Sequence, residues 1–442
     1  MNRRQFIKKS GFGATVFGLT GPMGMYVAGA SDPRRIEWSV KPKKWHSLGP
    51  VDLIAQVEAA LQWTNQSLIK YGIAWRPGGC CMRAACMPAE ACAYYYAMTG
   101  DETTLKAINA AVRTFRKYRH RARGRRVEYD EIKGPVKLDL VNEPQSRAAD
   151  YTIEYETISC HVGRNMRGMR AAAHVLRDER LLREASEELN WWIDNPLAFN
   201  REKHFFDARI FVDGRGKTVG SERKYTMNMG GSLASAMWMV GNDLGDKRLM
   251  EYAEDQIING IPPYQLDSGY FPYNTTHKYE LVDGIALDSN YYHGLTLQVL
   301  CPLLAYEHWQ RKPKYMEMMR RGAKYIRDKL TFEDGQCNHP KHIDVLREKK
   351  LGLKPKFPWG LTVNSALVHT MIYKYVGDAE AFSQAAKNMR WLHFNSPTGI
   401  PFLPGVGEGG ISYNFRQIVL IAWEGMHLRQ KGVSDIEVVF LG

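Results

Sequence analysis

The sequence predicts an all-α protein, an (α/α)6 toroid of six helical hairpins with minor β-hairpins in its long loops. A short turn recurs at Gly100-Asp101, Arg177-Asp178, Gly245-Asp246 and Gly377-Asp378, and Lys312-Pro313 stands where one further copy is expected. Successive copies are 77, 68, 66 and 66 residues apart, and such a period indicates a repeat architecture. Gly ends one helix in the left-handed conformation, and Asp accepts the free amides that begin the next.

Each turn joins two kinds of predicted helix. The helix before the turn is apolar or small on most sides, as in a buried helix, and the helix after it has a polar face typical of the surface. We expect buried helices over Met82–Met98, Thr157–Leu176, Met227–Leu244, Asn290–Trp309, Thr362–Tyr375 and Ser412–Arg429. We expect surface helices over Val51–Tyr71, Glu102–Tyr118, Glu179–Ile193, Lys247–Ile258, Lys314–Leu330 and Ala379–Leu392. Six buried helices inside six amphipathic ones make a closed toroid, and residues 31–442 read as one domain.

Some strand content is expected outside the helices. Arg126–Tyr129 and Val136–Leu140 flank a Gly-Pro turn, and Ala208–Val212 and Lys217–Val219 flank an Asp-Gly turn, which is a hairpin signal. Ile436–Leu441 also reads as a strand.

Residues 1–30 resemble a twin-arginine signal peptide. Arg3-Arg4 opens a basic segment, a mildly apolar Gly-rich run spans Gly11–Val27, and Ala28-Gly29-Ala30 offers a small-residue cleavage site. The resemblance implies export of the folded protein to the periplasm or the medium, with retention as an uncleaved anchor as the alternative. The run is too short and too rich in Gly for a good membrane span, so no stable span is expected after signal removal.

The net charge and the cysteine content limit the kinds of partner and metal site that we expect. Loss of four basic residues with the signal lowers the formal charge from +13 to +9, which favours acidic glycans or an anionic surface over nucleic acid. A solvated surface with surplus lysine fits equally well. Seven Cys cannot all pair within the chain, and the spacing of Cys80, Cys81, Cys86 and Cys92 is not that of a zinc site. We predict no metal and no cofactor, and a homodimer through the tail and basic loops is compatible with the sequence.

The connections between hairpins place the functional site. Loops from surface to buried helices cover residues 119–156, 194–226, 259–289, 331–361 and 393–411, far longer than the four to six residues typical of connections. All of them meet the N-terminal ends of the buried helices, where free amides and positive dipole ends are available. Long loops on one face tend to carry function, so we expect the site there.

Aromatic, carboxylate, amide and guanidinium side chains gather at these predicted helix starts. This mixture suits sugars, because ring faces stack on aromatic side chains and hydroxyls bond to polar groups. The substrate-binding candidates are His161, Arg164, Tyr225, Asn228, Tyr273, Asn290, Trp359, Tyr413 and Arg416.

The Gly-Asp turns, the Gly269–Tyr273 loop and the Asp288–Gly294 segment together make the chain resemble the six-hairpin glycosidase superfamily and the toroidal polysaccharide lyases. The resemblance covers nearly all of residues 51–432 and is one of architecture. It implies an enzyme that acts on a carbohydrate, and the chemistry then has to be argued from the residues.

Two mechanisms compete. A hydrolase needs two carboxylates across the scissile bond, and the candidates are Glu156, Asp283, Asp288 and Glu408. Asp288 equally fits the N-cap of a buried helix, and Glu156 equally fits the first turn of its helix.

A β-eliminating lyase instead needs groups that neutralise a uronate carboxylate and move protons. Tyr292 and His293 with Asn290 and an arginine would serve, although both side chains also fit roles in core packing. A non-catalytic glycan-binding protein is the third reading. We favour an exported glycoside hydrolase for a uronic-acid-containing oligo- or polysaccharide, such as a glucuronidase.

Overall fold

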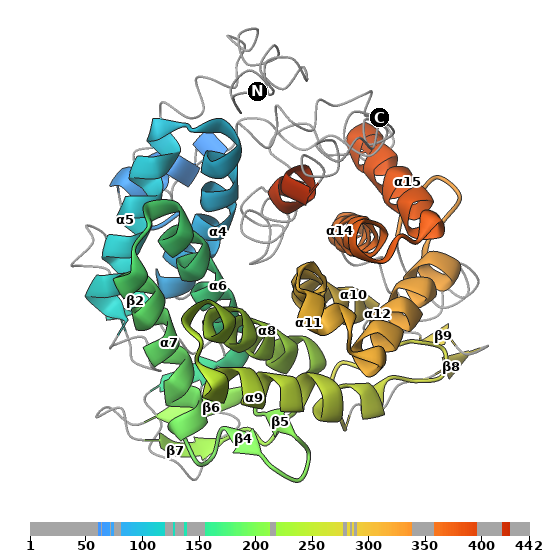
Figure 1. Cartoon of the computed structure of the whole chain (residues 1–442), viewed down its shortest axis with the longest axis horizontal. Coiled ribbons are helices and arrows are strands. Elements are labelled where there is room, and N and C mark those ends of the chain that lie inside the picture. Colours follow the sequence, from blue (N-terminus) through green and yellow to red (C-terminus); the bar gives the residue numbers. More distant parts are fainter. Residues whose placement is uncertain are drawn as a thin grey trace, which may run out of the picture.

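A ring of helices surrounds a second, inner ring in the computed structural model (Figure 1). The structure describes residues 61–62, 64–70, 72–74, 81–119, 127–128, 137–138, 155–212, 218–276, 281–282, 285–286, 290–337, 358–395 and 418–424. The inner helices are α4 (Cys81–Thr99), α6 (Ser159–Leu176), α8 (Met227–Leu244), α10 (Asn290–Leu300), α14 (Pro358–Val376) and residues 418–424. The outer helices are α5 (Glu102–Tyr118), α7 (Glu179–Asp194), α9 (Lys247–Asp255), α12 (Pro313–Tyr325) and α15 (Ala379–Asn395), and residues 64–70 are also helical. This arrangement confirms the predicted (α/α)6 toroid.

The recurrent turns have the predicted chemistry. Gly245 ends α8 with φ 70°, and the Asp246 side chain accepts the amide hydrogen of Leu249 at the start of α9. A Cβ on Gly245 would meet nothing within 4 Å, so backbone conformation rather than space requires glycine there. Arg177 takes the same left-handed conformation with φ 54°, and Asp178 caps α7 in the same way.

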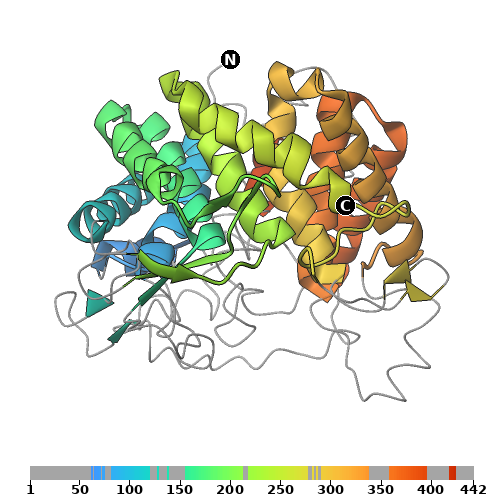
Figure 2. The same ribbon diagram turned by 90° about the horizontal axis from the view of Figure 1, so that it is seen from below.

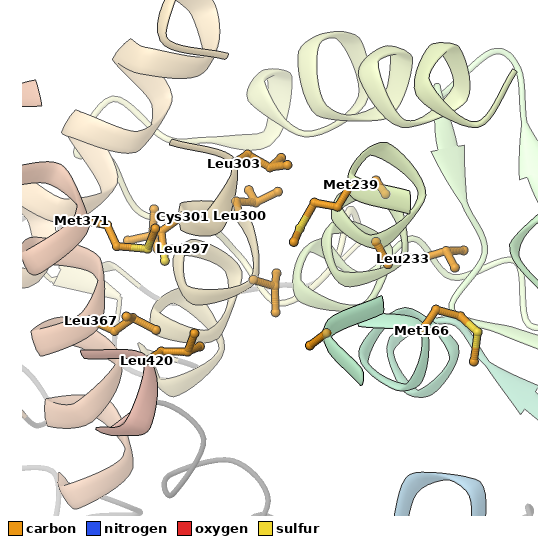
Figure 3. Close-up of a cluster of buried hydrophobic side chains, with 14 of the residues drawn as sticks. Met166, Leu233, Met239, Leu297, Leu300, Cys301, Leu303, Leu367, Met371 and Leu420 are labelled. Atoms are coloured by element: carbon orange, nitrogen blue, oxygen red, sulfur yellow. The ribbon is translucent and has the colours of Figure 1, made fainter. Parts of the chain in front are cut away.

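The inner helices pack directly on one another. A Cβ on Gly163 of α6 would lie 2.4 Å from the carbonyl oxygen of Ser232 on α8, so these two backbones approach closely. Apolar side chains fill the other contacts, and Figure 3 shows Leu297 and Cys301 beside Met371 of α14. Among the described residues, one extended core of buried apolar side chains therefore follows the ring, and a smaller cluster contains Met87 and Leu295.

Two features correct the predicted helix bounds. The helix expected over Asn290–Trp309 ends at Leu300 and continues as a 3-10 turn, η5 (Cys301–Ala305), and a short helix, α11 (Glu307–Gln310). Pro302 lacks the amide hydrogen that an α-helix needs at this position. The outer helices α9 and α12 run on into π-helical segments, η3 (Gln256–Gly260) and η6 (Ile326–Leu330), and a 3-10 turn, η4 (Pro262–Tyr264), follows η3.

Short strands lie on one side of the ring of helices (Figure 2). The two predicted hairpins are confirmed: β1 (Val127–Glu128) pairs with β2 (Lys137–Leu138), and β6 (Arg209–Val212) pairs with β7 (Thr218–Ser221). The structure adds β3 (Tyr155–Ile158), which pairs with β6, and two further hairpins. These are β4 (Phe199–Asn200) with β5 (Phe205–Phe206), and β8 (Leu281–Val282) with β9 (Ile285–Ala286). Thr157, expected to begin a helix, thus lies in a strand.

Several expectations lie outside the described residues, namely the signal segment 1–30 and the strand at 436–441. Among the described helices, none combines the length and the apolar character needed to cross a bilayer. The same part of the chain holds no group of three or more His, Cys, Asp or Glu placed to bind a metal ion. Five buried cysteines form no disulfide within the described part of the chain: Cys86, Cys92, Cys160, Cys301 and Cys337.

Candidate active site at the N-terminal rim

The N-terminal rim is the side of the toroid on which the inner helices begin. β3 leads directly into α6, so Cys160 and His161 lie in its first turn. The segment after η4 crosses the start of α8, where the Met227 amide donates to the carbonyl oxygen of Tyr273 at 3.2 Å. A β-bridge between Thr226 and Asn274 fixes the same crossing. The start of α8 is therefore held beside this loop.

Two tyrosines from different elements meet at this rim. The ring centroids of Tyr273 and Tyr292 lie 4.2 Å apart with planes tilted by 40°. Tyr292 lies in the first turn of α10, and 36% of it is exposed. Burial raises the pKa of Tyr292, and the nearby Cys160 adds to the effect. Burial raises the pKa of Tyr273 as well, with smaller contributions from Tyr292 and Cys160. These three side chains form what we call the rim cluster.

Charged side chains lie next to the rim cluster. The Lys224 ammonium lies 5.3 Å from the centroid of the Tyr273 ring, in a cation–π contact. Glu222 pairs with Arg209 at 3.2 Å and lies 3.9 Å from Lys224. Sequence reasoning did not select Cys160, Lys224, Arg209 or Glu222. For Glu222 and Lys224, the position just before an inner helix is a signal that could have drawn attention to them.

The buried carboxylate of Asp207 holds the backbone around Arg209 and Lys224 in place. Asp207 is 2% exposed and accepts the backbone amide hydrogens of Arg209 at 3.2 Å and Lys224 at 3.3 Å. Burial raises the pKa of Asp207 to about 6. The hydrogen bonds stabilise the charged carboxylate and so act to lower this pKa, but burial has the larger effect. Asp207 therefore holds the turn that positions Lys224.

Two predicted substrate-binding residues, at the end of the second long loop and at the start of α8, are buried. Tyr225 is 8% exposed, accepts a hydrogen bond from Asn200 at 2.8 Å and packs against Phe205. Its ring is part of the core, which corrects the expectation that it stacks on a sugar. Asn228 is buried in the first turn of α8, and its Oδ1 has no hydrogen-bond donor among the described residues.

Of the predicted site residues, His293 has the surroundings that differ most from those expected of a catalytic residue. It is fully buried, and its Nδ1 accepts the amide hydrogen of Phe271 while its Nε2 donates to the carbonyl oxygen of Gly322, both at 3.0 Å. Burial lowers the pKa of His293 to about 4, so the ring is neutral near pH 7. Because both nitrogens are bonded to backbone, His293 ties α10 to a loop and to α12. This geometry corrects its predicted catalytic role to a structural one.

The remaining candidates fall into three groups. His161 is partly buried in the first turn of α6, and Arg164 lies one turn further in and is 1% exposed. The backbones of Glu156, Asn290 and Trp359 lie in β3, at the start of α10 and in the first turn of α14. Outside the described residues lie Asp283, Asp288, Glu408, Tyr413 and Arg416.

Comparison with known proteins gives a result for structure alone. No protein-family model matches the chain, and no curated protein matches its sequence. An unsaturated glucuronyl hydrolase specific for heparin matches with a TM-score of 0.56 and 10% identity, over 86% of this chain and 97% of that chain. A cellobiose 2-epimerase from Bacillus thermoamylovorans B4167 matches with a TM-score of 0.53 and 13% identity, over 78% and 88%. A D-mannose isomerase matches with a TM-score of 0.51 and 10% identity, over 76% and 85%.

The chain therefore shares the (α/α)6 toroid fold of these three sugar-processing enzymes. At these identities the likeness establishes the fold and carries no residue role. Within the six-hairpin fold, the rim cluster offers a partly exposed phenol, a second aromatic ring and a nearby cation. Such groups can stack on a sugar ring, donate a proton and attract an anion.

Proposed function

We propose that this six-hairpin protein is a carbohydrate-active enzyme that acts at its N-terminal rim on a glycan containing uronic acid. The observation that carries the proposal is the pairing of Tyr273 with Tyr292 beside Lys224, where the inner helices begin. Enzymes that process sugars share the fold, including one specific for heparin, which is an acidic glycan.

Hydrolysis is the first candidate reaction. In this proposal two of Glu156, Asp283, Asp288 and Glu408 act as the acid and its partner carboxylate. Tyr273 and Tyr292 stack on the sugar, while arginine and lysine side chains attract the uronate carboxylate. Of the other candidates, Trp359 and Tyr413 would add stacking surfaces, and Asn228, Asn290, His161 and Arg416 would bind hydroxyls or the carboxylate.

β-Elimination is the second candidate, and the position of the partly exposed Tyr292 at the rim suits it. A phenol is protonated near pH 7 at its ordinary pKa, and burial raises the pKa of Tyr292 further. A protonated phenol suits a general acid that protonates the leaving oxygen. Another group would then remove the C5 proton, and Asn290 with an arginine would neutralise the uronate carboxylate.

One assay separates these reactions. The purified protein is incubated with heparan sulfate, chondroitin and a neutral glucan, while ultraviolet absorbance and reducing ends are followed. Rising absorbance indicates elimination, since the unsaturated product absorbs, and reducing ends without absorbance indicate hydrolysis. Binding without cleavage would show a non-catalytic glycan-binding protein. If the assay shows hydrolysis, Glu408→Gln and Asp288→Asn test the acid pair, and full turnover by both would contradict this assignment.

We also propose export by the twin-arginine route to the periplasm or the medium. The basis is the order of Arg3-Arg4, the Gly-rich run and Ala28-Gly29-Ala30. Replacing Arg3 and Arg4 by Lys should retain the protein in the cytoplasm. Unchanged export of that variant in a cell fractionation would contradict the proposal.

A further inference from the structure

Charged and phenolic side chains from several inner helices meet inside the toroid. Glu90 and Tyr94 come from α4, Arg167 and Arg170 from α6, Asp243 from α8, and Tyr306 follows η5. The positive charge of Arg167 acts to lower the pKa values of both Tyr94 and Tyr306, which belong to hairpins on either side of it. We call these six residues the axial cluster.

Most of the hydrogen-bonding capacity of Arg170 is used within the axial cluster. Its Nε and Nη2 bond to the two carboxylate oxygens of Asp243 at 2.5 and 3.0 Å, and Nη2 also donates to the Tyr306 hydroxyl at 2.8 Å. This bidentate ion pair joins α6 to α8, and the bond to Tyr306 adds a contact with the next hairpin. Arg170 therefore serves the fold.

Arg167 differs from Arg170. Its side chain is 1% exposed, and Nη2 bonds to a single oxygen of Glu90 at 3.0 Å. Its Nε and Nη1 have no acceptor among the described residues. A guanidinium has five N–H donors, so one bond from Nη2 to Glu90 leaves unused a two-donor edge made of the second N–H of Nη2 and a neighbouring N–H. Buried donors without acceptors are unfavourable and rare in native proteins, so an acceptor is expected at this position.

The unused edge of Arg167 has the geometry that carboxylates prefer. Guanidinium and carboxylate groups form two parallel charge-assisted hydrogen bonds, which a neutral hydroxyl does not reproduce. Arg164, one turn nearer the N-terminal rim on the same helix, adds another buried cation. Arg167 is the ninth residue of α6, so it lies about 12 Å along the helix from the rim.

We propose that Arg167 binds the carboxylate of a terminal uronic acid residue that reaches into the toroid from the N-terminal rim. The inference rests on the proposed function and deepens it, because it makes the chain end of an acidic glycan the substrate. Beneath Arg167, the bonded Arg170, Asp243 and Tyr306 cross between inner hairpins. In this proposal these bonded residues stop the glycan, so that its end meets Arg167.

The test uses the mature protein and two matched probes, D-glucuronate and D-glucose, in titration calorimetry and thermal unfolding. We expect glucuronate to bind and to raise the melting temperature, and glucose to do neither. Arg167→Lys should weaken glucuronate binding at least tenfold. Arg170→Lys, the matched buried control, should lower the melting temperature but keep the glucuronate-induced rise. Glu90→Gln should keep or strengthen binding, because it removes a competing carboxylate.

Several results would overturn the inference. They are equal binding of glucose and glucuronate, unchanged binding by Arg167→Lys, and an equal effect of acetate, which would mean an adventitious ion only. If Arg167→Lys fails to fold, the neutral pair Glu90→Gln/Arg167→Gln replaces it and should also lose glucuronate binding. Retained binding by that variant would contradict the proposal.

Failure of this subsite and failure of the proposed function give different results. If glucuronate binding depends on Arg167 but the protein cleaves no acidic glycan, the result supports the subsite and contradicts the enzyme assignment. Cleavage of acidic glycans with an unchanged KM in Arg167→Lys keeps the enzyme assignment and removes the subsite.

Discussion

The rings of Tyr273 and Tyr292 lie 4.2 Å apart and couple the starts of two inner helices. The carbonyl oxygen of Tyr273 accepts the first amide hydrogen of α8, while Tyr292 belongs to the first turn of α10. One residue thus caps one inner helix through its backbone and contacts the next through its side chain. A ligand that displaced either ring would disturb both helix starts.

Tyr292→Phe and Tyr292→Ala separate the hydroxyl from the ring. If the reaction is elimination with Tyr292 as general acid, Tyr292→Phe should lower kcat by about 10²-fold or more. If the reaction is hydrolysis, Tyr292→Phe should keep kcat, and only Tyr292→Ala should raise KM, because the stacking surface is lost. Steady-state kinetics on the cleaved glycan decide, with Tyr252→Phe on α9 as a control that should match the wild type. Unaltered kinetics in both Tyr292 variants would remove this residue from the site.

The buried neutral His293 predicts loss of stability in acid. Its folded pKa of about 4 lies below the ordinary value of about 6.5, so the unfolded chain binds more protons between these pH values. Stability is fully present above about pH 6.5 and falls as the pH drops toward 4, by up to ~1.4 kcal/mol per pH unit for one such group. His369, also buried with a pKa lowered to about 4, should add to the slope.

Urea unfolding at pH 7.5 and pH 5 measures this effect. His293→Gln should lower stability at pH 7.5, because backbone hydrogen bonds are lost, and should reduce the difference between the two pH values. A difference as large as in the wild type would show that His293 does not titrate on unfolding.

The pair of Arg170 with Asp243 should stabilise the toroid far more than surface pairs do. Asp243→Asn leaves the mostly buried Arg170 without its carboxylate and should cost about 3 kcal/mol. Arg183→Ala breaks an exposed pair with Glu179 and should cost less than about 0.5 kcal/mol. Thermal unfolding compares them, and similar melting temperatures for the two variants would refute the difference.

The hairpin turns offer a test of backbone conformation alone. Gly245→Ala should destabilise by about 1 kcal/mol, because φ is 70° although nothing fills the space of the new Cβ. Arg177→Gly should stabilise by about 0.5–1 kcal/mol, because Arg177 holds the same left-handed conformation with a Cβ. The two opposite signs are measured by urea unfolding. A stabilising Gly245→Ala would mean that the turn relaxes.

Local signals in the sequence predicted most of the fold. The bounds of α5 and α8 match the prediction to the residue, because Gly and Asp punctuate the hairpins. The break after Leu300 was missed although Pro302 was visible, since a proline near a helix end is compatible with several outcomes. β3 was missed because its partner strand β6 lies more than fifty residues away.

The site was harder to predict than the fold. The position of Tyr292 at a helix start was read correctly, but the burial of His293 and Tyr225 depends on neighbours from other hairpins. The pairs Arg167–Glu90 and Arg170–Asp243 join residues 77 and 73 positions apart, and nothing local in the sequence announces them. Side-chain partners across hairpins therefore need the structure.

The most direct test of the central claim is cleavage of acidic against neutral glycans by the purified protein, with products identified by mass spectrometry. The account predicts products that carry a uronic acid or its unsaturated form from an acidic glycan, and none from a matched neutral glucan. Absence of both binding and cleavage across uronate-containing glycans, in a protein shown to be folded, would contradict it.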